Sequence, residues 1–291
     1  MGSLRDIKRH IKSVQNTAQI TKAMEMVASS KMRKAQQAAL NGRPYAYFLN
    51  RMLVSVRNHV DSSMDPLLAQ RPVTRTLVIL LSTDRGLCGG LNSNLFREMR
   101  RFDKATTDFI SIGRKGTQAL TRGGWNIIAE FPLQENPTAA AMRTVSKFAR
   151  ERFVSGKCDS VEVLFPAFVN TLEQKPRVMP LLPITDFVDA GFILPGDNVP
   201  PTVNSTTELL IEPHPHKVLD VLLPFYVDFL LFQMTLGTRA SEHSARMVAM
   251  KSANDSAEGI IKELTISYNK VRQDKITTEI LEIATAQLAM D

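Results

Sequence analysis

The chain has 291 residues, of which 44% are hydrophobic and 22% charged, and its formal net charge at pH 7 is +7. This composition is ordinary for a folded globular protein and provides enough material for one large core or two small ones. The two cysteines, Cys88 and Cys158, exclude a disulfide framework and a cysteine zinc site, and they favour a reducing compartment. Residues 1–13 are charged and lack a compact apolar core, so we expect no signal peptide.

Residues 3–41 contain neither proline nor glycine and are predicted to form one long helix, with Ser3 as its N-cap. Positions spaced alternately three and four residues apart are apolar except for two, which is typical of one strand of a coiled coil. At a rise of about 1.5 Å per residue, this helix would be about 55 to 60 Å long. The positions of this stripe are Leu4, Ile7, Ile11, Val14, Ala18, Thr21, Glu25, Ala28, Met32, Ala35 and Ala39.

A second apolar line, Ile20, Met24 and Val27, lies on another face of this helix and is available to a partner outside the coiled coil. This region is also strongly basic, because residues 5–43 contain nine lysines and arginines but only two acidic residues. A basic helix suits an acidic protein surface or nucleic acid, although such a charge run is also typical of a solvated face. Because aromatic residues do not alternate with the basic ones, we favour an acidic protein partner.

The stretch from Asn41 to Pro44 ends the first helix, and residues 45–59 are predicted to form a second one. From residue 74 onward, short apolar runs alternate with helical segments and glycine-rich turns. This alternation predicts a small α/β domain with a mainly parallel sheet, inserted between two long helices. Strands are expected at residues 76–81, 109–112, 125–131, 160–165 and 177–184, helices at 95–105, 115–120 and 137–154, a loop at 195–205 and an extended segment at 208–211.

Residues 216–291 are predicted to form the second long helix, bent near its start at Pro224. Its most apolar part, residues 218–236, is interrupted by charged residues and falls short of the ~20 clean apolar residues of a membrane span, so a buried helix is expected. A coiled-coil stripe follows, resumes one register later, and needs a partner helix, which residues 3–41 provide. Its positions are Ala257, Ile261, Leu264, Tyr268 and Val271, and then Ile276, Ile280 and Ile283.

These elements predict the α/β fold class, with a long antiparallel coiled coil of the N- and C-terminal helices and an inserted Rossmann-like α/β domain. We divide the chain into an N-terminal coiled-coil helix at residues 1–60, an inserted α/β domain at residues 74–205 and a C-terminal coiled-coil helix at residues 208–291. The two terminal helices are expected to pair asymmetrically, because the C-terminal helix is the longer one and projects well past its partner.

A glycine-rich turn, residues 84–90 (DRGLCGG), follows a predicted strand and precedes a predicted helix, which is where a phosphate cradle would lie. It matches neither a dinucleotide fingerprint nor a P-loop, so a tight strand-to-helix turn is the better interpretation. Cys88 lies in this turn, and we interpret it as structural because the sequence offers no base to activate its thiol.

The histidines do not predict a metal site, because His214 and His216 are too sparse without further ligands. The string from Ser241 to Ser244 (SEHS) contains the residue types of a nucleophile set. However, adjacent positions on a helix point in different directions, so we expect these residues to be polar positions on a helix surface. We therefore predict no catalytic residues, no metal site and no cofactor in this chain.

Four stretches, in order and with matching spacing, resemble the gamma subunit of F-type ATP synthases: residues 4–36, 82–95, 240–251 and 268–282. The resemblance implies a non-catalytic rotor shaft that transmits torque between an ion-driven ring of c subunits and a catalytic hexamer of alpha and beta subunits, for ATP synthesis or hydrolysis. It also implies that the catalytic sites lie on the beta subunits. The implied partners are the alpha, beta, epsilon, delta and c subunits, with one copy of this chain per complex, at the cytoplasmic face of a bacterial plasma membrane.

Carried over onto this sequence, the resemblance implies contact residues and no catalytic ones. Lys22 and Met24 would meet the acidic lever segment of a beta subunit, and Arg272 suits bidentate contact with a carboxylate. At the C-terminal tip, the family usually carries Gly-Ala where this chain has Ala286 and Gln287. The implied beta-subunit contacts are Lys22, Met24, Arg272, Gln273, Thr277, Glu279 and Glu282, and the implied contact at the base, near the c ring, is Glu212.

Two alternatives come from other classes of function. A coiled-coil scaffold would bind nucleic acid through the basic N-terminal helix, and strongly salt-dependent binding to DNA would favour it. A nucleotide-dependent enzyme would use the α/β domain, and nucleotide turnover by the isolated chain would favour that reading.

Overall fold

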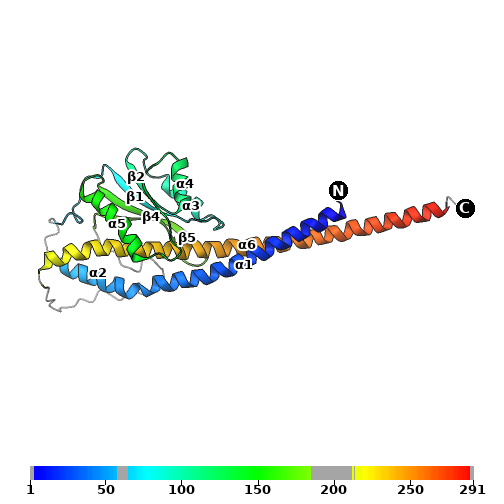
Figure 1. Ribbon diagram of the computed structural model, residues 1–291, viewed down its shortest axis with the longest axis horizontal. Coiled ribbons are helices and arrows are strands. Elements are labelled where there is room, and N and C mark those ends of the chain that lie inside the picture. Colours follow the sequence, from blue (N-terminus) through cyan, green and yellow to red (C-terminus); the bar gives the residue numbers. More distant parts are fainter. Residues whose placement is uncertain (1–2, 58–64, 185–211, 213, 289–291) are drawn as a thin grey trace. The chain divides into compact units, whose positions relative to one another are not determined.

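The computed structural model describes residues 3–57, 65–184, 212 and 214–288 (Figure 1). The chain forms two compact units, one of residues 28–246 and the other of residues 3–27 together with residues 247–288. The predicted loop at 195–205 and the predicted extended segment at 208–211 lie outside the described residues.

The larger unit contains a five-stranded sheet with the strand order β3-β2-β1-β4-β5 (Figure 1). The first four strands in this order pair in parallel, and β5 runs antiparallel to β4. The predicted mainly parallel sheet is therefore confirmed, and its central strand is an apolar run that is buried over nearly its whole length. The strands are β1 (Thr76–Leu81), β2 (Thr107–Ile112), β3 (Asn126–Phe131), β4 (Ser160–Phe168) and β5 (Gln174–Leu182).

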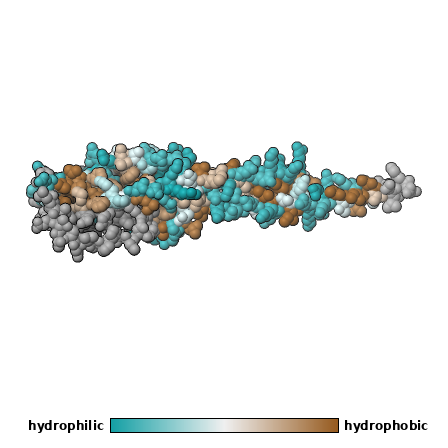
Figure 2. All heavy atoms as spheres, turned by 90° about the horizontal axis from the view of Figure 1, so that it is seen from below, coloured by the Kyte–Doolittle hydropathy of each residue, from teal (hydrophilic) through white to brown (hydrophobic). Residues whose placement is uncertain are grey.

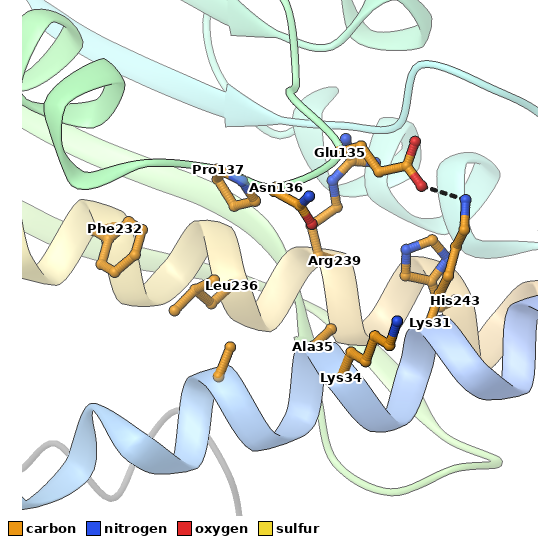
Figure 3. A pocket seen from close by; sticks show the side chains of 11 residues that line it. Lys31, Lys34, Ala35, Glu135, Asn136, Pro137, Phe232, Leu236, Arg239 and His243 are labelled. Carbon is orange, nitrogen blue, oxygen red and sulfur yellow. Dashed lines mark hydrogen bonds and ion pairs between the residues drawn. The ribbon is translucent and has the colours of Figure 1, made fainter.

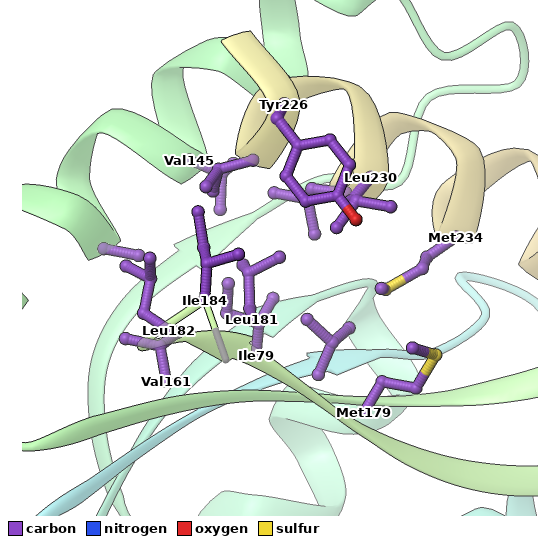
Figure 4. Close-up of a cluster of buried hydrophobic side chains, with 14 of the residues drawn as sticks. Ile79, Val145, Val161, Met179, Leu181, Leu182, Ile184, Tyr226, Leu230 and Met234 are labelled. Atoms are coloured by element: carbon purple, nitrogen blue, oxygen red, sulfur yellow. The ribbon is translucent and has the colours of Figure 1, made fainter. Parts of the chain in front are cut away.

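Helices cover both faces of the sheet. On one face, α3 (Leu91–Met99) and α4 (Arg114–Arg122) pack over a cluster that includes Phe109 and Trp125. On the other face, α5 (Ala139–Val154) and the start of α6 (Pro215–Leu288) pack over a larger cluster, in which Tyr226, Leu230 and Met234 of α6 lie against strand residues (Figure 4). The sheet is thus the middle layer of three, and its larger core includes part of a long terminal helix.

Helix α3 differs from its predicted bounds of 95–105. It begins four residues earlier because Leu91, Leu95 and Met99, spaced four apart, form its buried face. It ends earlier because the chain turns after Arg100, and Asp103 Oδ1 accepts a hydrogen bond from the Ala105 amide at 3.1 Å. The apolar spacing, and not the helix-forming residues downstream, sets the helix bounds here.

Three helices make up the rest of the chain: α1 (Leu4–Asn41), α2 (Arg43–Arg57) and α6 (Pro215–Leu288). Ser3 is the N-cap of α1, since its Oγ accepts a hydrogen bond from the Asp6 amide at 3.3 Å. Only Gly42 separates α1 from α2. A Cβ at this position would lie 1.8 Å from Gln233 Nε2, so a larger residue here would require the end of the Gln233 side chain to move.

The apolar start of α6 is a core helix of the larger unit. By length and composition alone, α6 contains an 18-residue window apolar enough to cross a membrane, with a mean hydropathy of 1.5. Half of that window is buried inside the protein, and Leu223, Val227 and Leu231 belong to the larger core cluster. The expectation of a buried helix over residues 218–236 is confirmed.

In the smaller unit, α1 and α6 lie side by side and antiparallel, as a coiled coil (Figure 1). The predicted stripe positions are buried or half-buried, from Leu4 to Ala18 on α1 and from Ala257 to Val271 on α6, whereas the intervening positions are exposed. On α1, Ile20 and Val27 of the second apolar line are exposed, as expected. The coiled-coil prediction therefore holds as far as Val271.

Beyond Val271, α6 projects past its partner helix, as predicted. Every position from Arg272 to Thr285 is exposed, including Ile276, Ile280 and Ile283 of the resumed stripe. In Figure 1 the end of α6 extends past the start of α1, and the surface view in Figure 2 shows hydrophobic side chains along this end. α1 is too short to reach these residues, so this part of the stripe is unpaired. We call residues 272–285 the free end of α6.

The tight entry into α4 provides a test of the α/β core. Gly113 has a φ of +101°, and a Cβ there would lie 2.4 Å from the Ser82 carbonyl oxygen. We expect Gly113→Ala to lower the free energy of unfolding by at least about 2 kcal/mol, because it adds strain and a backbone clash. Urea unfolding followed by circular dichroism measures this change. The matched control is Gly259→Ala on an open face of α6, which should be neutral or slightly stabilising.

Candidate functional sites on helix α6

Helix α6 lies across the carboxyl ends of β1 and β4. Arg246 Nη2 donates to the carbonyl oxygen of Gly86, in the turn after β1, at 3.3 Å. Ser244 Oγ donates to the carbonyl oxygen of Thr171, after β4, at 2.7 Å. In this strand order the connections change direction between β1 and β4, which is the edge where doubly wound sheets bind nucleotides. Here α6 occupies that edge.

The glycine-rich turn forms part of the surface that α6 contacts at this edge of the sheet. Leu87 and Gly89 both have positive φ values, 62° and 56°, so the chain reverses sharply between β1 and α3. The interpretation as a tight strand-to-helix turn is confirmed. Within the turn, Cys88 accepts a hydrogen bond from Asn92 Nδ2 at 3.4 Å, and burial raises the pKa of its thiol. A raised pKa keeps the sulfur protonated, which suits a structural cysteine.

Three charged residues of α6 form a buried group that we call the α6 ion network: Arg239, Glu242 and Arg246. Arg239 Nη1 lies 2.6 Å from Glu242 Oε2, and Arg246 Nη2 lies 2.7 Å from Glu242 Oε1. Arg239 also donates to the carbonyl oxygens of Leu133 and Gln134, in the loop before α5. Both oxygens of a carboxylate that is 2% exposed are therefore paired, and the network joins α6 to two separate loops.

The expectation that residues 241–244 form a polar helix surface is wrong. All four residues are at least nine-tenths buried, because the loops of the α/β domain wrap around this part of α6. The serines do not form a nucleophile set with His243, however. Ser244 Oγ donates to a carbonyl oxygen, and among the described residues no hydrogen bond joins His243 to a serine.

A second anchor holds α6 against α5 through Asp228. This carboxylate accepts a hydrogen bond from Ser146, and it lies 3.3 Å from Arg143 Nε and 3.1 Å from Arg150 Nη2. The sequence indicated Asp228 only as an interruption of an apolar run. Its function as an anchor depends on residues about 80 positions earlier, which no local pattern connects to it.

The predicted contact residues at the C-terminal end all lie on the free end of α6. Arg272 and Gln273 make no side-chain hydrogen bond or ion pair with any residue that the structure describes. Glu279 is 3.6 Å from Lys275 in an exposed pair, and Thr277 Oγ1 bonds only the helix backbone. Glu282 is exposed as well. This set is therefore accessible, and its described side-chain contacts are confined to the helix itself.

The other predicted contact residues lie elsewhere. Lys22 pairs with Glu25 at 3.1 Å on α1, and the neighbouring Met24 is half-buried. No contact in the described part of the chain joins them to the free end of α6. Glu212, in the larger unit, is exposed.

Comparison with known proteins identifies the type of chain. A family model described as "ATP synthase" matches residues 3–290. The chain is 45% identical to the ATP synthase gamma chain of Opitutus terrae over 292 residues, covering 99% of both chains. It is 44% identical to the ATP synthase gamma chain of Akkermansia muciniphila, and that match covers the whole of both chains.

Two solved structures share the fold. A chain of the Euglena gracilis mitochondrial ATP synthase matches with a TM-score of 0.67 and 18% identity, over 99% of this chain and 94% of that one. A chain of the Tetrahymena thermophila mitochondrial ATP synthase, from a structure of its central stalk and c ring, matches with a TM-score of 0.62 and 24% identity. That match covers 80% of this chain and 99% of the other.

The α6 ion network predicts a large loss of stability when one charge is removed. We expect Arg239→Met to lower the free energy of unfolding by about 3 kcal/mol, because Glu242 loses a partner inside the protein. Urea unfolding of the full chain measures this change. The exposed Arg272→Met is the control and should change stability by less than about 0.5 kcal/mol. A loss equally small for Arg239→Met would show that the network does not stabilise the fold.

The buried His243 predicts a pH dependence of stability. Burial, together with the nearby Arg246, lowers the pKa of His243 to about 4, although Glu242 opposes the shift. Between pH 6.5 and 4 the unfolded chain binds a proton that the folded chain does not. Stability should therefore fall on acidification through this window, by at most about 1.4 kcal/mol per pH unit.

In His243→Gln this contribution disappears, so the curve of unfolding free energy against pH should be flatter than that of the wild type between pH 6.5 and 4. The exposed His10→Gln is the control and should keep the wild-type slope. If the unfolding free energy of His243→Gln fell with pH as steeply as that of the wild type, the lowered pKa of His243 would be contradicted.

Proposed function

The chain belongs to the family of ATP synthase gamma chains, and from this premise we propose how its parts perform the work of a rotor shaft. It is the central rotor shaft of an F-type ATP synthase, a non-catalytic subunit that transmits torque in a membrane-associated complex. The observation that carries the proposal is the free end of α6, a helix end that is exposed on all sides and partly apolar.

Torque passes between the α/β domain and the shaft at the anchors of α6. The α6 ion network and Asp228 connect α6 to the two loops and to α5 by buried, charged contacts. A buried charged contact resists slippage because each group that leaves its partner loses stabilisation inside the protein. A single helix from Pro215 to Leu288 then carries the rotation to the coiled coil without a break.

The free end of α6 contacts the beta subunits through Arg272, Gln273, Thr277, Glu279 and Glu282. Exposed polar side chains on a rotating helix can exchange hydrogen bonds with each beta subunit in turn. The guanidinium of Arg272 is suited to bidentate contact with a carboxylate. On α1, Lys22 and Met24 contact the acidic lever of a beta subunit, and the pairing of Lys22 with Glu25 is exposed and therefore easily exchanged.

At the other end of the shaft, Glu212 contacts the c ring. We further propose that one copy of the chain assembles with alpha, beta, epsilon and delta subunits at the cytoplasmic face of the bacterial membrane, and that the catalytic sites lie on the beta subunits. The predicted division of the chain at residues 1–60, 74–205 and 208–291 belongs to the same proposal.

The two alternatives are less well supported. Nothing in the fold or in the names of the relatives favours a nucleic-acid scaffold. A nucleotide-dependent enzyme would need the edge of the sheet between β1 and β4, and Ser244 and Arg246 of α6 occupy it.

Affinity purification from detergent-solubilised membranes tests the assembly. We expect mass spectrometry to recover alpha, beta, epsilon and c subunits, with one copy of this chain per three alpha–beta pairs. Recovery of nucleic acid or unrelated proteins alone would contradict the shaft assignment.

Arg272 provides a test of the free end. We expect Arg272→Ala to reduce ATP-driven ion pumping by the assembled enzyme several-fold, because a charged hydrogen bond to a beta subunit is lost, and to leave the fold intact. Proton or sodium uptake into vesicles and single-molecule torque measure the effect. The exposed Lys262→Ala, also on α6, is the control and should pump at the wild-type rate. Unchanged pumping and torque in Arg272→Ala would count against this contact.

A further inference from the structure

A cavity of about 360 Å³ lies within the larger unit, between α1, α6 and the loop of residues 135–137 (Figure 3). Its volume is within the range of small-molecule binding sites. Because three separate elements line it, a bound molecule would touch all three. Neither the ion network nor the free end of α6 explains why this space is open.

One side of the cavity is apolar. Phe232 and Leu236 line it from α6, Ala35 faces them from α1, and Pro137 lies at the loop (Figure 3). Ala38 of α1 also lines the cavity. The two alanines leave the space that larger side chains would fill in a packed helix interface. This wall suits an aromatic ring or a branched aliphatic chain.

The other side of the cavity is cationic. The ammonium of Lys34 makes no hydrogen bond or ion pair with any residue that the structure describes, and neither does the side chain of Asn136. Lys31 pairs with Glu135, but both side chains are substantially exposed, so a stronger anion can displace this partner. Arg239 also lines the cavity, but its donors are used by the α6 ion network and the loop carbonyls.

We propose that this cavity binds a small amphipathic anion, with its apolar body against Phe232 and Leu236 and its carboxylate or phosphate on the ammonium of Lys34. Asn136 also lines the cavity and provides an amide donor, and Lys31 becomes a second cation when the anion displaces Glu135. The ligand joins α1 to α6 and to the loop before α5. Its binding therefore stabilises this unit against unfolding.

Three probes of one shape and different charge test the chemistry. We use the full chain with indole-3-acetate, its neutral amide indole-3-acetamide, and the cation tryptamine. Binding is followed by calorimetry and by NMR of methyl-labelled alanine and leucine. Indole-3-acetate should bind and shift methyl signals of Ala35, Ala38 and Leu236, and the other two probes should bind at least about tenfold more weakly, since they lack the charge-assisted contact.

Matched variants assign the site. Lys34→Glu should weaken indole-3-acetate binding at least about tenfold. Arg33→Glu is the control, because it makes the same change in charge one position away, outside the cavity lining, and it should bind as the wild type does. Ala38→Phe fills the cavity from an exposed helix position, so it should abolish binding and leave the circular dichroism spectrum unchanged.

Three results would overturn the proposal. The first is equal affinity for the three probes, and the second is indole-3-acetate binding that survives both Lys34→Glu and Ala38→Phe. The third is binding of a hexaglutamate peptide, sensitive to Lys34→Glu, with no binding of indole-3-acetate. That result would assign the cavity to an acidic protein segment instead of a small molecule.

Discussion

The buried carboxylate of Glu242 is the constraint on which the larger unit depends. A charge inside a protein is tolerated only when it is paired and hydrogen-bonded, and both of its oxygens are held by arginines of the same helix. Those arginines in turn satisfy carbonyl oxygens in two loops that are far apart in the sequence. The helix, the glycine-rich turn and the loop before α5 therefore hold one another in position.

The same contacts explain why a Rossmann-like sheet serves a mechanical function here. Its strand order creates an edge that in other proteins receives a nucleotide. In this chain the edge receives α6, through Ser244 and Arg246. The fold alone would suggest a ligand-binding domain. The contacts at this edge show that it binds a helix of the same chain instead, so the function is inferred from the contacts and not from the fold.

Patterns that repeat locally could be predicted from the sequence. The apolar runs located all five strands, and the 3-4 spacing located the coiled coil as far as Val271. The burial of residues 241–244 could not be predicted, because the groups that surround them come from residues 85–86, 133–134 and 171. One local signal was available: Arg239, Glu242 and Arg246 stand three and four positions apart, the spacing of ion pairs on one helix face.

Because α6 is unbroken, the number of residues between two of its sites fixes the angle between them about the helix axis. Arg246 in the ion network and Arg272 at the free end are separated by about seven helical turns, and each residue of a helix adds about 100° of rotation. Inserting or deleting one residue between them would leave both sites chemically intact and point them in different directions around the axis. A substitution in this stretch keeps the angle between the two sites about the helix axis, whereas an insertion or deletion changes that angle. Changes of length should therefore be tolerated less well than changes of residue.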